Sequence, residues 1–394
     1  MFKHGGRRES TFRVARFVPA DTVGSNVIRE TSMKLAAALA ALAMTAATAA
    51  LAQEKVVNVY NWSDYIDESV LKDFEKETGI RVQYDVFDSN ELLETKMLAG
   101  GSGYDVVVPT GTFLSRQIKA GVFQKLDQDK LSNAGNQWDT VKQRTAAYDP
   151  ENAYTVNYMW GTTGIGYNKE KVEEILGEDA PVDSLSLIFD PKNAEKLAEC
   201  GIHILDAPTE LIPASLKYIG EDPNSKDPEV LKKAEGVMMA IRPHVKKFHS
   251  SEYINALANG DICVAFGWSG DVLQARDRAK EAKSGNTIVY EIPKEGALMW
   301  FDQMAIPADA PNPDYAHQFI DFMLKGENAA KASNFVNYAN GNLAAQEFLN
   351  KSVIDDPAIY PDEKTMENLY SVTAYPPKVN RMVTRMWTRI KTGQ

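Results

Sequence analysis

Aromatic residues next to carboxylates recur along the chain, in or next to segments that the residue pattern predicts to be β-strands. Large π faces attract cations and cover methylene groups, and carboxylates accept charge-assisted hydrogen bonds from ammonium groups. Together they suit an alkyl-ammonium ligand. Any single pair has an ordinary alternative, a packed ring beside a helix cap, and Asp64 or Asp271 could each cap a following helix. The pairs are Trp62-Ser63-Asp64, Asp206 to Glu210, Trp268 to Asp271, Trp300 to Asp302, and Tyr338.

Motifs for other chemistries are missing from the sequence. There is no nucleophile elbow, no P-loop and no zinc-protease motif, and the turn at 100–103 lacks the Gly-Lys-Ser/Thr of a phosphate loop. The histidines after residue 52, which are His203, His244, His249 and His317, are not spaced as a ligand pair. We therefore expect no metal, no cofactor and no enzymatic activity. A glycosidase that pairs Asp271 with Asp302 remains an alternative.

Predicted strands and helices alternate, which indicates an α/β fold with a parallel sheet. In such sheets, ligands lie at the carboxyl ends of the strands, so the residues after Tyr60 and Pro109 become site candidates. Asp88 and Glu91 are spaced as a capping box for the helix at 88–99. The predicted strands span 56–60, 81–87, 105–109, 164–168, 202–206, 261–268, 288–293 and 299–306. The predicted helices span 69–78, 88–99, 113–120, 170–176, 210–219, 229–241, 251–259 and 313–324, followed by a basic helical end from about residue 361.

The beginning of the chain is predicted to be a signal peptide. Basic residues precede an Ala- and Leu-rich run that ends in Ala50-Leu51-Ala52, a small-x-small cleavage pattern. Met33 is the expected translation start, with residues 1–32 as an upstream extension. A transmembrane helix is the alternative, but the run is only marginally apolar and no basic cluster follows it. Cleavage near Ala52 implies export to the periplasm.

The net charge and the length of the exported part of the chain limit its possible partners and its number of domains. The 394 residues carry 43 Lys+Arg and 54 Asp+Glu, a net charge of −11. Residues 1–52 hold seven of these basic and three of these acidic residues, so the remaining 342 residues have a net charge of −15. A net anion repels nucleic acid and anionic membranes, and the length suits two domains.

The only two cysteines, Cys200 and Cys263, both lie in the exported part. Export favours a bridge between them, which would close a loop of 63 residues and contribute roughly 4 kcal/mol in the chain-entropy model. Two buried small apolar side chains remain the alternative.

Longer motifs extend the aromatic and acidic pairs. They are Asn61-Trp-Ser-Asp-Tyr65, Tyr104-Asp-Val-Val-Val-Pro109, Tyr158-Met-Trp-Gly-Thr-Thr-Gly-Ile-Gly-Tyr167, Asp206-Ala-Pro208, Asn259-Gly-Asp-Ile-Cys263 and Gly267-Trp-Ser-Gly-Asp271. With these motifs the chain resembles the periplasmic polyamine-binding proteins of bacterial ABC importers, with the putrescine branch closest. The resemblance covers essentially all of residues 53–394.

The resemblance implies the two-lobed periplasmic binding-protein fold of type II, with a hinge, an interlobe cleft and the Cys200–Cys263 disulfide. Lobe 1 would comprise 53–157 and 296–340, and lobe 2 would comprise 158–295 and 341–394. Because the sequence contains no Pro/Gly/Ser-rich linker, the chain is expected to cross between the lobes on extended segments, with 155–160 and 289–295 as the candidates. The implied ligand residues are Trp62, Ser63, Asp64, Thr110, Glu210, Trp268, Asp271, Trp300, Asp302 and Tyr338.

Two of these positions depart from the putrescine branch: Thr110 stands in place of Ser, and Trp300 in place of Phe. Because Trp at this position resembles the spermidine-preferring members, the residues leave the choice between putrescine and spermidine open.

The expected function is therefore capture of a polyamine, putrescine or spermidine, by a monomer that delivers it to an ABC permease. No nucleic-acid partner is expected. Carriers of ferric ion, sugar or another small polar or cationic solute remain alternatives. So does a sensor that signals to a membrane receptor.

Overall fold

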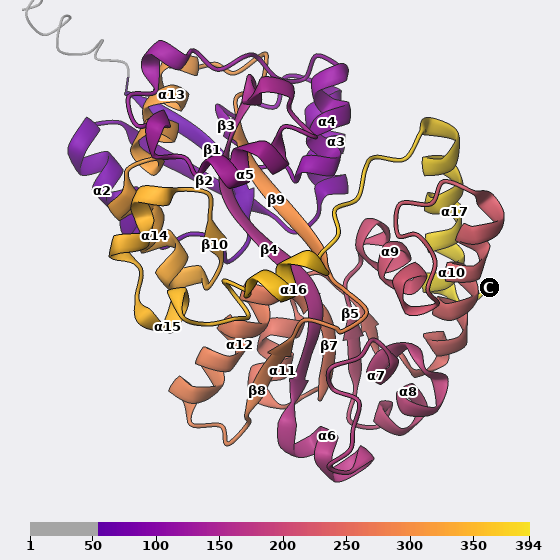
Figure 1. Cartoon of the computed structure of the whole chain (residues 1–394). Helices are drawn as coiled ribbons and strands as arrows, with labels where there is room; N and C mark the ends of the chain where they lie inside the picture. The colour runs from indigo at the N-terminus through magenta and orange to yellow at the C-terminus, as the bar shows by residue number, and fades with distance from the viewer. Residues whose placement is uncertain (1–53) are drawn as a thin grey trace, which may run out of the picture. The chain divides into compact units, whose positions relative to one another are not determined.

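The computed structural model describes residues 54–394, and Lys55–Gln394 form one compact unit (Figure 1). The predicted signal peptide and its upstream extension lie outside the described residues. Within 54–394, no helix combines the length and the hydropathy that a membrane span requires.

Ten strands of the described part form a single sheet in the order β2-β1-β3-β9-β4-β7-β5-β6, with β10 and β8 paired to β4. The strands are β1 (Val56–Trp62), β2 (Arg81–Phe87), β3 (Val106–Val107), β4 (Thr155–Asn168), β5 (Ile202–Ile204), β6 (Lys247–Phe248), β7 (Val264–Trp268), β8 (Ile288–Glu291), β9 (Leu298–Ala305) and β10 (Ala339–Asn340).

Helices pack around this sheet. The α-helices are α2 (Glu68–Thr78), α3 (Asn90–Ala99), α4 (Gly111–Lys119), α5 (Asp139–Thr145), α6 (Lys169–Leu176), α7 (Ser186–Phe189), α8 (Pro191–Leu197), α9 (Pro208–Tyr218), α10 (Pro228–Ile241), α11 (Tyr253–Asn259), α12 (Ser269–Ala282), α13 (Pro313–Met323), α14 (Gly326–Val336), α15 (Lys351–Ile354), α16 (Glu363–Glu367) and α17 (Pro377–Thr392). Short 3-10 helices are η1 (Gln128–Lys130), η2 (Ala134–Asn136), η3 (Pro150–Asn152), η4 (Arg242–His244) and η5 (Leu343–Phe348).

The sheet is mixed, so the predicted parallel pairing is present in its two outer parts and absent from its centre. β1 pairs in parallel with β2 and β3, and β5 pairs in parallel with β6 and β7, as strand–helix alternation requires. β4 and β9, however, run antiparallel to each other and to their outer neighbours β7 and β3. Both strands are buried along their whole length, so they carry no alternation of polar and apolar residues that would reveal their direction.

β4 and β9 connect the two halves of the sheet and lie side by side in Figure 1. β9 pairs with β3 on one side and with β4 on the other. β8 pairs with β4 only between Ile165 and Asn168. The boundaries of the two lobes, and the crossings between them at 155–160 and 289–295, stay predictions.

Most predicted helices occur within a few residues of their expected ends, because their caps are encoded locally. Asp67 caps α2 by accepting a hydrogen bond from the backbone of Ser69, and Gly79 ends it at φ 68°. The predicted capping residue of α3 is wrong by one position. Ser89, not Asp88, accepts from the backbone of Leu92. The predicted strand at 105–109 shortens to Val106–Val107.

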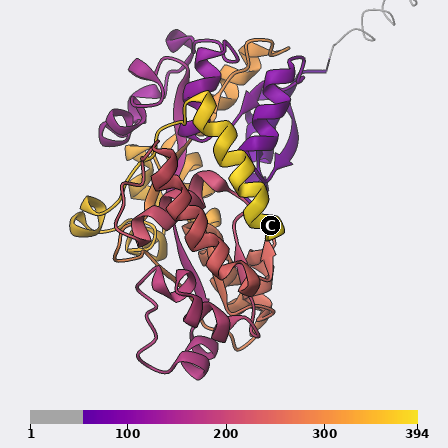
Figure 2. The ribbon, with the colours of Figure 1, turned by 90° about the vertical axis from the view of Figure 1, so that its right-hand side faces the viewer.

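The C-terminal helix α17 is amphipathic and packs beside α10, where the turned view of Figure 2 shows it. Its apolar face buries Val383, Met386, Trp387 and Ile390. Arg389 pairs with Glu235 of α10 at 2.6 Å, while Arg381 and Arg385 are exposed, as expected for a solvated terminal helix.

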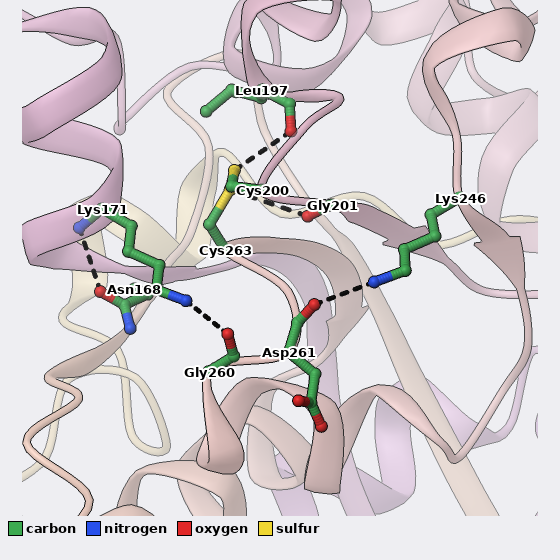
Figure 3. Close-up of a disulfide and its surroundings, with 9 residues drawn as sticks. All are labelled: Asn168, Lys171, Leu197, Cys200, Gly201, Lys246, Gly260, Asp261 and Cys263. Atoms are coloured by element: carbon green, nitrogen blue, oxygen red, sulfur yellow. Dashed lines mark hydrogen bonds between the residues drawn. A yellow bond between two sulfur atoms is a disulfide. The ribbon is translucent and has the colours of Figure 1, made fainter.

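The predicted bridge is present between Cys200, which follows α8, and Cys263, which precedes β7 (Figure 3). Their Cα atoms lie 5.5 Å apart, and Cys263 is fully buried. The Lys246 ammonium donates to the carbonyl of Asp261 at 3.0 Å, and Lys171 donates to that of Gly260. These contacts hold the start of β7, whose other end contributes Trp268 to the candidate site.

Candidate functional site

A cavity lies where several strands and helices end. Segments that follow β1, β3 and β6 contribute to it, as do β9 and the first turns of α9 and α12. Its lining residues are Trp62, Ser63, Tyr65, Asp88, Asn90, Thr110, Glu210, Ser250, Trp268, Asp271, Trp300, Asp302 and Tyr338.

Nine of the ten ligand residues predicted from the sequence line this cavity, and Asp64 does not. Asp64 adopts a left-handed backbone conformation with φ 53°. Its carboxylate accepts a hydrogen bond from the Arg278 guanidinium at 2.8 Å. Asp64 is therefore neutralised by a residue of α12, whereas its neighbours Ser63 and Tyr65 line the cavity.

Four further residues that the sequence did not predict as ligand residues also line the cavity: Tyr65, Asp88, Asn90 and Ser250. Tyr65 ends the motif that begins at Asn61, and its closeness to Trp62 and Ser63 in the sequence could have marked it as a lining residue. Asn90 supports a predicted residue, because its side chain donates to the Thr110 hydroxyl at 2.9 Å and accepts from the Thr110 backbone at 3.1 Å.

Asp302 projects from the middle of β9 and is 4% exposed. Its two carboxylate oxygens accept hydrogen bonds from the hydroxyls of Thr110 at 2.6 Å and Tyr65 at 2.9 Å. Burial raises the pKa of Asp302 to about 7, although both hydroxyls favour the charged form.

Asp271 lies in the first turn of α12 and is 8% exposed. Trp268 is the N-cap residue of this helix, and Asp271 makes no capping hydrogen bond. Its carboxylate instead accepts from the hydroxyls of Tyr338 at 2.7 Å and Tyr253 at 2.8 Å. Burial raises the pKa of Asp271 to about 6 against the opposing effect of these two hydrogen bonds.

Glu210 lies in the first turn of α9 and is 8% exposed. The Thr163 hydroxyl from β4 donates to its carboxylate at 2.6 Å. Burial raises the pKa of Glu210 to about 7, and the nearby charge of Asp302 raises it further. Thr163 and Tyr253, which hold two of the three carboxylates, were not predicted.

Four predicted aromatic residues border the same space. The rings of Trp62 and Trp268 meet edge to face, with centroids 5.5 Å apart, and those of Trp300 and Tyr338 lie 5.3 Å apart. Trp62 is fixed by a hydrogen bond from its Nε1 to the carbonyl of Val108 at 2.9 Å. The rings can cover methylene groups and present π faces to a cation.

The cavity has a marked charge asymmetry. None of the described Lys, Arg or His residues lines it, and Glu210, Asp271 and Asp302 form no ion pair with any of them. Across residues 54–394, no group of three or more His, Cys, Asp or Glu residues is arranged to hold a metal ion. Buried carboxylates without cations are costly, so this site favours an organic cation that brings its own positive charges.

Comparisons with known proteins agree with this geometry. Residues 69–361 match the family model described as bacterial extracellular solute-binding protein. The chain is 52% identical over 343 residues to the putrescine-binding periplasmic protein SpuD of Pseudomonas aeruginosa (strain UCBPP-PA14), covering 87% of this chain and 94% of that protein. It is 50% identical over 344 residues to the putrescine-binding periplasmic protein PotF of Escherichia coli (strain K12), covering 87% and 93%.

A solved structure shows the same fold. It is the spermidine/putrescine ABC transporter substrate-binding protein PotD from Streptococcus pneumoniae strain Canada MDR_19A. This chain superimposes on it with a TM-score of 0.70 and 30% identity, covering 86% of this chain and 99% of that chain. The α/β fold of a periplasmic binding protein is thereby confirmed. The chain belongs to the family of bacterial extracellular solute-binding proteins, among the periplasmic putrescine- and spermidine-binding proteins.

Proposed function

We propose that the protein captures a polyamine, putrescine first, outside the cytoplasm and delivers it to an ABC importer, without chemistry of its own. One observation carries this proposal: three buried carboxylates share a cavity with five aromatic rings, and no basic side chain among the described residues lines that cavity. The names of the relatives support the same ligand class.

The ligand would lie extended between the rings. Trp62, Trp268, Trp300 and Tyr338 would flank its methylenes, and Ser63 and Thr110 would accept further N–H bonds. Asp302 and Glu210 or Asp271 would neutralise the ammonium groups. Asp64, the fourth carboxylate expected to do so, is paired with Arg278 and would act outside the cavity.

Periplasmic location, a signal peptide cleaved near Ala52 and a monomeric carrier complete the proposal. The ligand residues come from β1 and β9 on one side and from α9 and α12 on the other. A ligand that touches both sides would bind a closed form better and shift the population toward it. The closed form would then dock to the permease.

Calorimetry on refolded, ligand-stripped protein tests the proposal directly. We expect putrescine to bind, with cadaverine, spermidine and spermine measured in parallel. An Asp302→Asn variant should lose at least a hundredfold in affinity, because one ammonium group then lacks a charged acceptor. Lys130→Ala, which changes an exposed residue that does not line the cavity, is the control and should bind as the wild type does. If none of the four amines gives heat with the wild-type protein, the proposal is wrong.

A further inference from the structure

We infer that Gly161 is a positioning residue that sets ligand selectivity through Trp300. Because Gly161 has no side chain, the indole ring of Trp300, which borders the cavity, can pack directly over its Cα. This inference rests on the proposed polyamine function. Gly161 itself does not line the cavity, so its effect is indirect.

The strand register places the two residues opposite each other. Gly161 of β4 is the Cα partner of Trp300 in the antiparallel pair β4–β9. Directly opposed residues in such a pair project to the same face of the sheet, with Cβ atoms about 5 Å apart. The space above Gly161 is therefore the space into which the Trp300 side chain extends.

The indole ring of Trp300 fills the space that a side chain at position 161 would occupy. A Cβ atom built on Gly161 would lie 2.7 Å from Cζ2 and 2.9 Å from Cη2 of Trp300, and 3.0 Å from the Ser269 Oγ. Carbon atoms in contact prefer 3.5–4.0 Å, so an alanine at 161 and the present position of the indole exclude each other.

Packing alone decides where this indole lies. Its Nε1 is buried and has no hydrogen-bond partner among residues 54–394, in contrast to Trp62, whose Nε1 donates to Val108. Two of the neighbours that pack against Trp300 are Gly161 beneath its outer edge and the Tyr338 ring at 5.3 Å. A methyl group at 161 would displace this ring, which lines the cavity, without breaking any hydrogen bond of Trp300.

Glycine is required at position 161 only when position 300 is a tryptophan. Cζ2 and Cη2 are the outer atoms of the indole, and a phenylalanine side chain has no atoms that reach so far. Gly161 and Trp300 should therefore behave as a coupled pair, in which the cost of alanine at 161 depends on the residue at 300.

A double-mutant cycle tests the coupling. Wild type, Gly161→Ala, Trp300→Phe and the double variant are titrated with putrescine and with spermidine by calorimetry. We expect Gly161→Ala to lower the affinity of the wild type at least tenfold. The loss should be at least threefold greater for spermidine, because the displaced ring leaves less room for the longer ligand. In the Trp300→Phe background, the same change should cost less than threefold.

Gly166→Ala is the matched control. It lies on the same strand and is as crowded, since its Cβ would come within 2.6 Å of Val272 Cγ2, but neither residue lines the cavity. It should lower thermal stability and leave the ratio of putrescine to spermidine affinity unchanged. This ratio separates a positioning role from general damage to the strand.

Each outcome is decisive. Equal losses in both backgrounds, or a Gly161→Ala protein with the wild-type affinity and ligand ratio, would overturn the inference while polyamine binding by the wild type stands. A wild type that binds neither amine overturns both proposals. If Gly161→Ala fails to fold, a double variant that folds and binds like Trp300→Phe supports the coupling. A double variant that also fails contradicts it, because Ser269 would then impose the limit.

Discussion

The three buried carboxylates of the cavity are held by hydroxyl groups rather than by cations. Asp302 and Asp271 each accept two hydroxyl hydrogen bonds, and Glu210 accepts one. Hydroxyls orient a carboxylate and lower the cost of its burial, but they do not cancel its charge. The charge of each carboxylate is balanced either by a bound proton or by an entering cation, which couples ligand binding to proton release.

Affinity for putrescine should therefore depend on pH. Because burial raises the pKa of Asp302 and Glu210 to about 7 and that of Asp271 to about 6, these groups take up protons as the pH falls from 8 to 5. The ligand stays dicationic throughout this range and must displace these protons. We expect at least a tenfold weaker affinity at pH 5 than at pH 8.

Calorimetry at four pH values, in buffers of different ionisation enthalpy, measures both the affinity and the protons released. The Asp302→Asn variant should show a shallower dependence, since one titrating group is gone. An affinity that is constant between pH 5 and pH 8, or stronger at pH 5, would contradict the role of these carboxylates.

Most of the residues that line the cavity could be predicted from residue types in the sequence. The residues for which this prediction failed each have a local structural cause. Asp64 sits within a predicted motif, yet its left-handed backbone turns its carboxylate toward Arg278, 214 residues further along the chain. Ser250 follows the two-residue strand β6, which is too short to produce a recognisable pattern. Asn90 acts through Thr110, and such side-chain support depends on contacts that no spacing rule contains.

At the scale of elements, β4 and β9 organise the site. They pair from Thr155 to Thr163 with one register shift between Asn157 and Met159. The Asn157 side chain spans this irregularity by donating to the carbonyls of Met159 and Asp302, each at 3.1 Å. The backbone of a candidate ligand residue is thus tied to the bulge in the neighbouring strand.

Only 164–168 of β4 was predicted as a strand, and the physical reason is composition. Gly161, Gly164 and Gly166 lower β-propensity, and each makes room for a large side chain packed against it: Trp300, Tyr290 or Val272. The strand forms because β9, β7 and β8 supply its partners, all of them more than 90 residues later in the chain.

The disulfide should stabilise the half of the sheet that contains β5 and β7. Replacing both cysteines by serine removes a constraint on a loop of 63 residues, so we expect a loss of roughly 4 kcal/mol in the free energy of unfolding. Denaturant unfolding monitored by circular dichroism measures it. Because the bridge lies outside the cavity lining, putrescine affinity at 25 °C should stay within threefold. Wild-type protein treated with a reductant is the control, and an unchanged unfolding midpoint in both would contradict the expectation.

At the scale of the molecule, the cavity residues come from distant parts of one compact unit, from Trp62 to Tyr338. The proposed cycle requires this unit to open and close around the ligand. The Asp64–Arg278 ion pair joins the turn after β1 to α12, and the Gln274 amide donates to the Asp64 carbonyl at 3.4 Å. These contacts connect the same two sides that the ligand would bridge.

Closure should be visible in solution. We expect putrescine to reduce the radius of gyration of the ligand-stripped protein in small-angle X-ray scattering, because a ligand that contacts both sides favours the compact form. The Asp302→Asn variant should show no such change at the same putrescine concentration. A wild-type scattering curve that is identical with and without saturating putrescine would exclude closure driven by the ligand.

The sequence by itself determined the chemistry of the protein: aromatic and acidic residues at segment ends, an α/β order of elements, and a cysteine pair. These features depend on residue type and on neighbours a few positions away, which local physics controls. Only the tertiary structure decided which carboxylates share the cavity, that β4 and β9 run antiparallel, and that Trp300 rests on Gly161. Those facts follow from contacts between segments that lie well apart in the sequence, by 31 residues for Asp271 and Asp302 and by 139 residues for Gly161 and Trp300. Over such separations, burial and packing rather than sequence spacing select the neighbours.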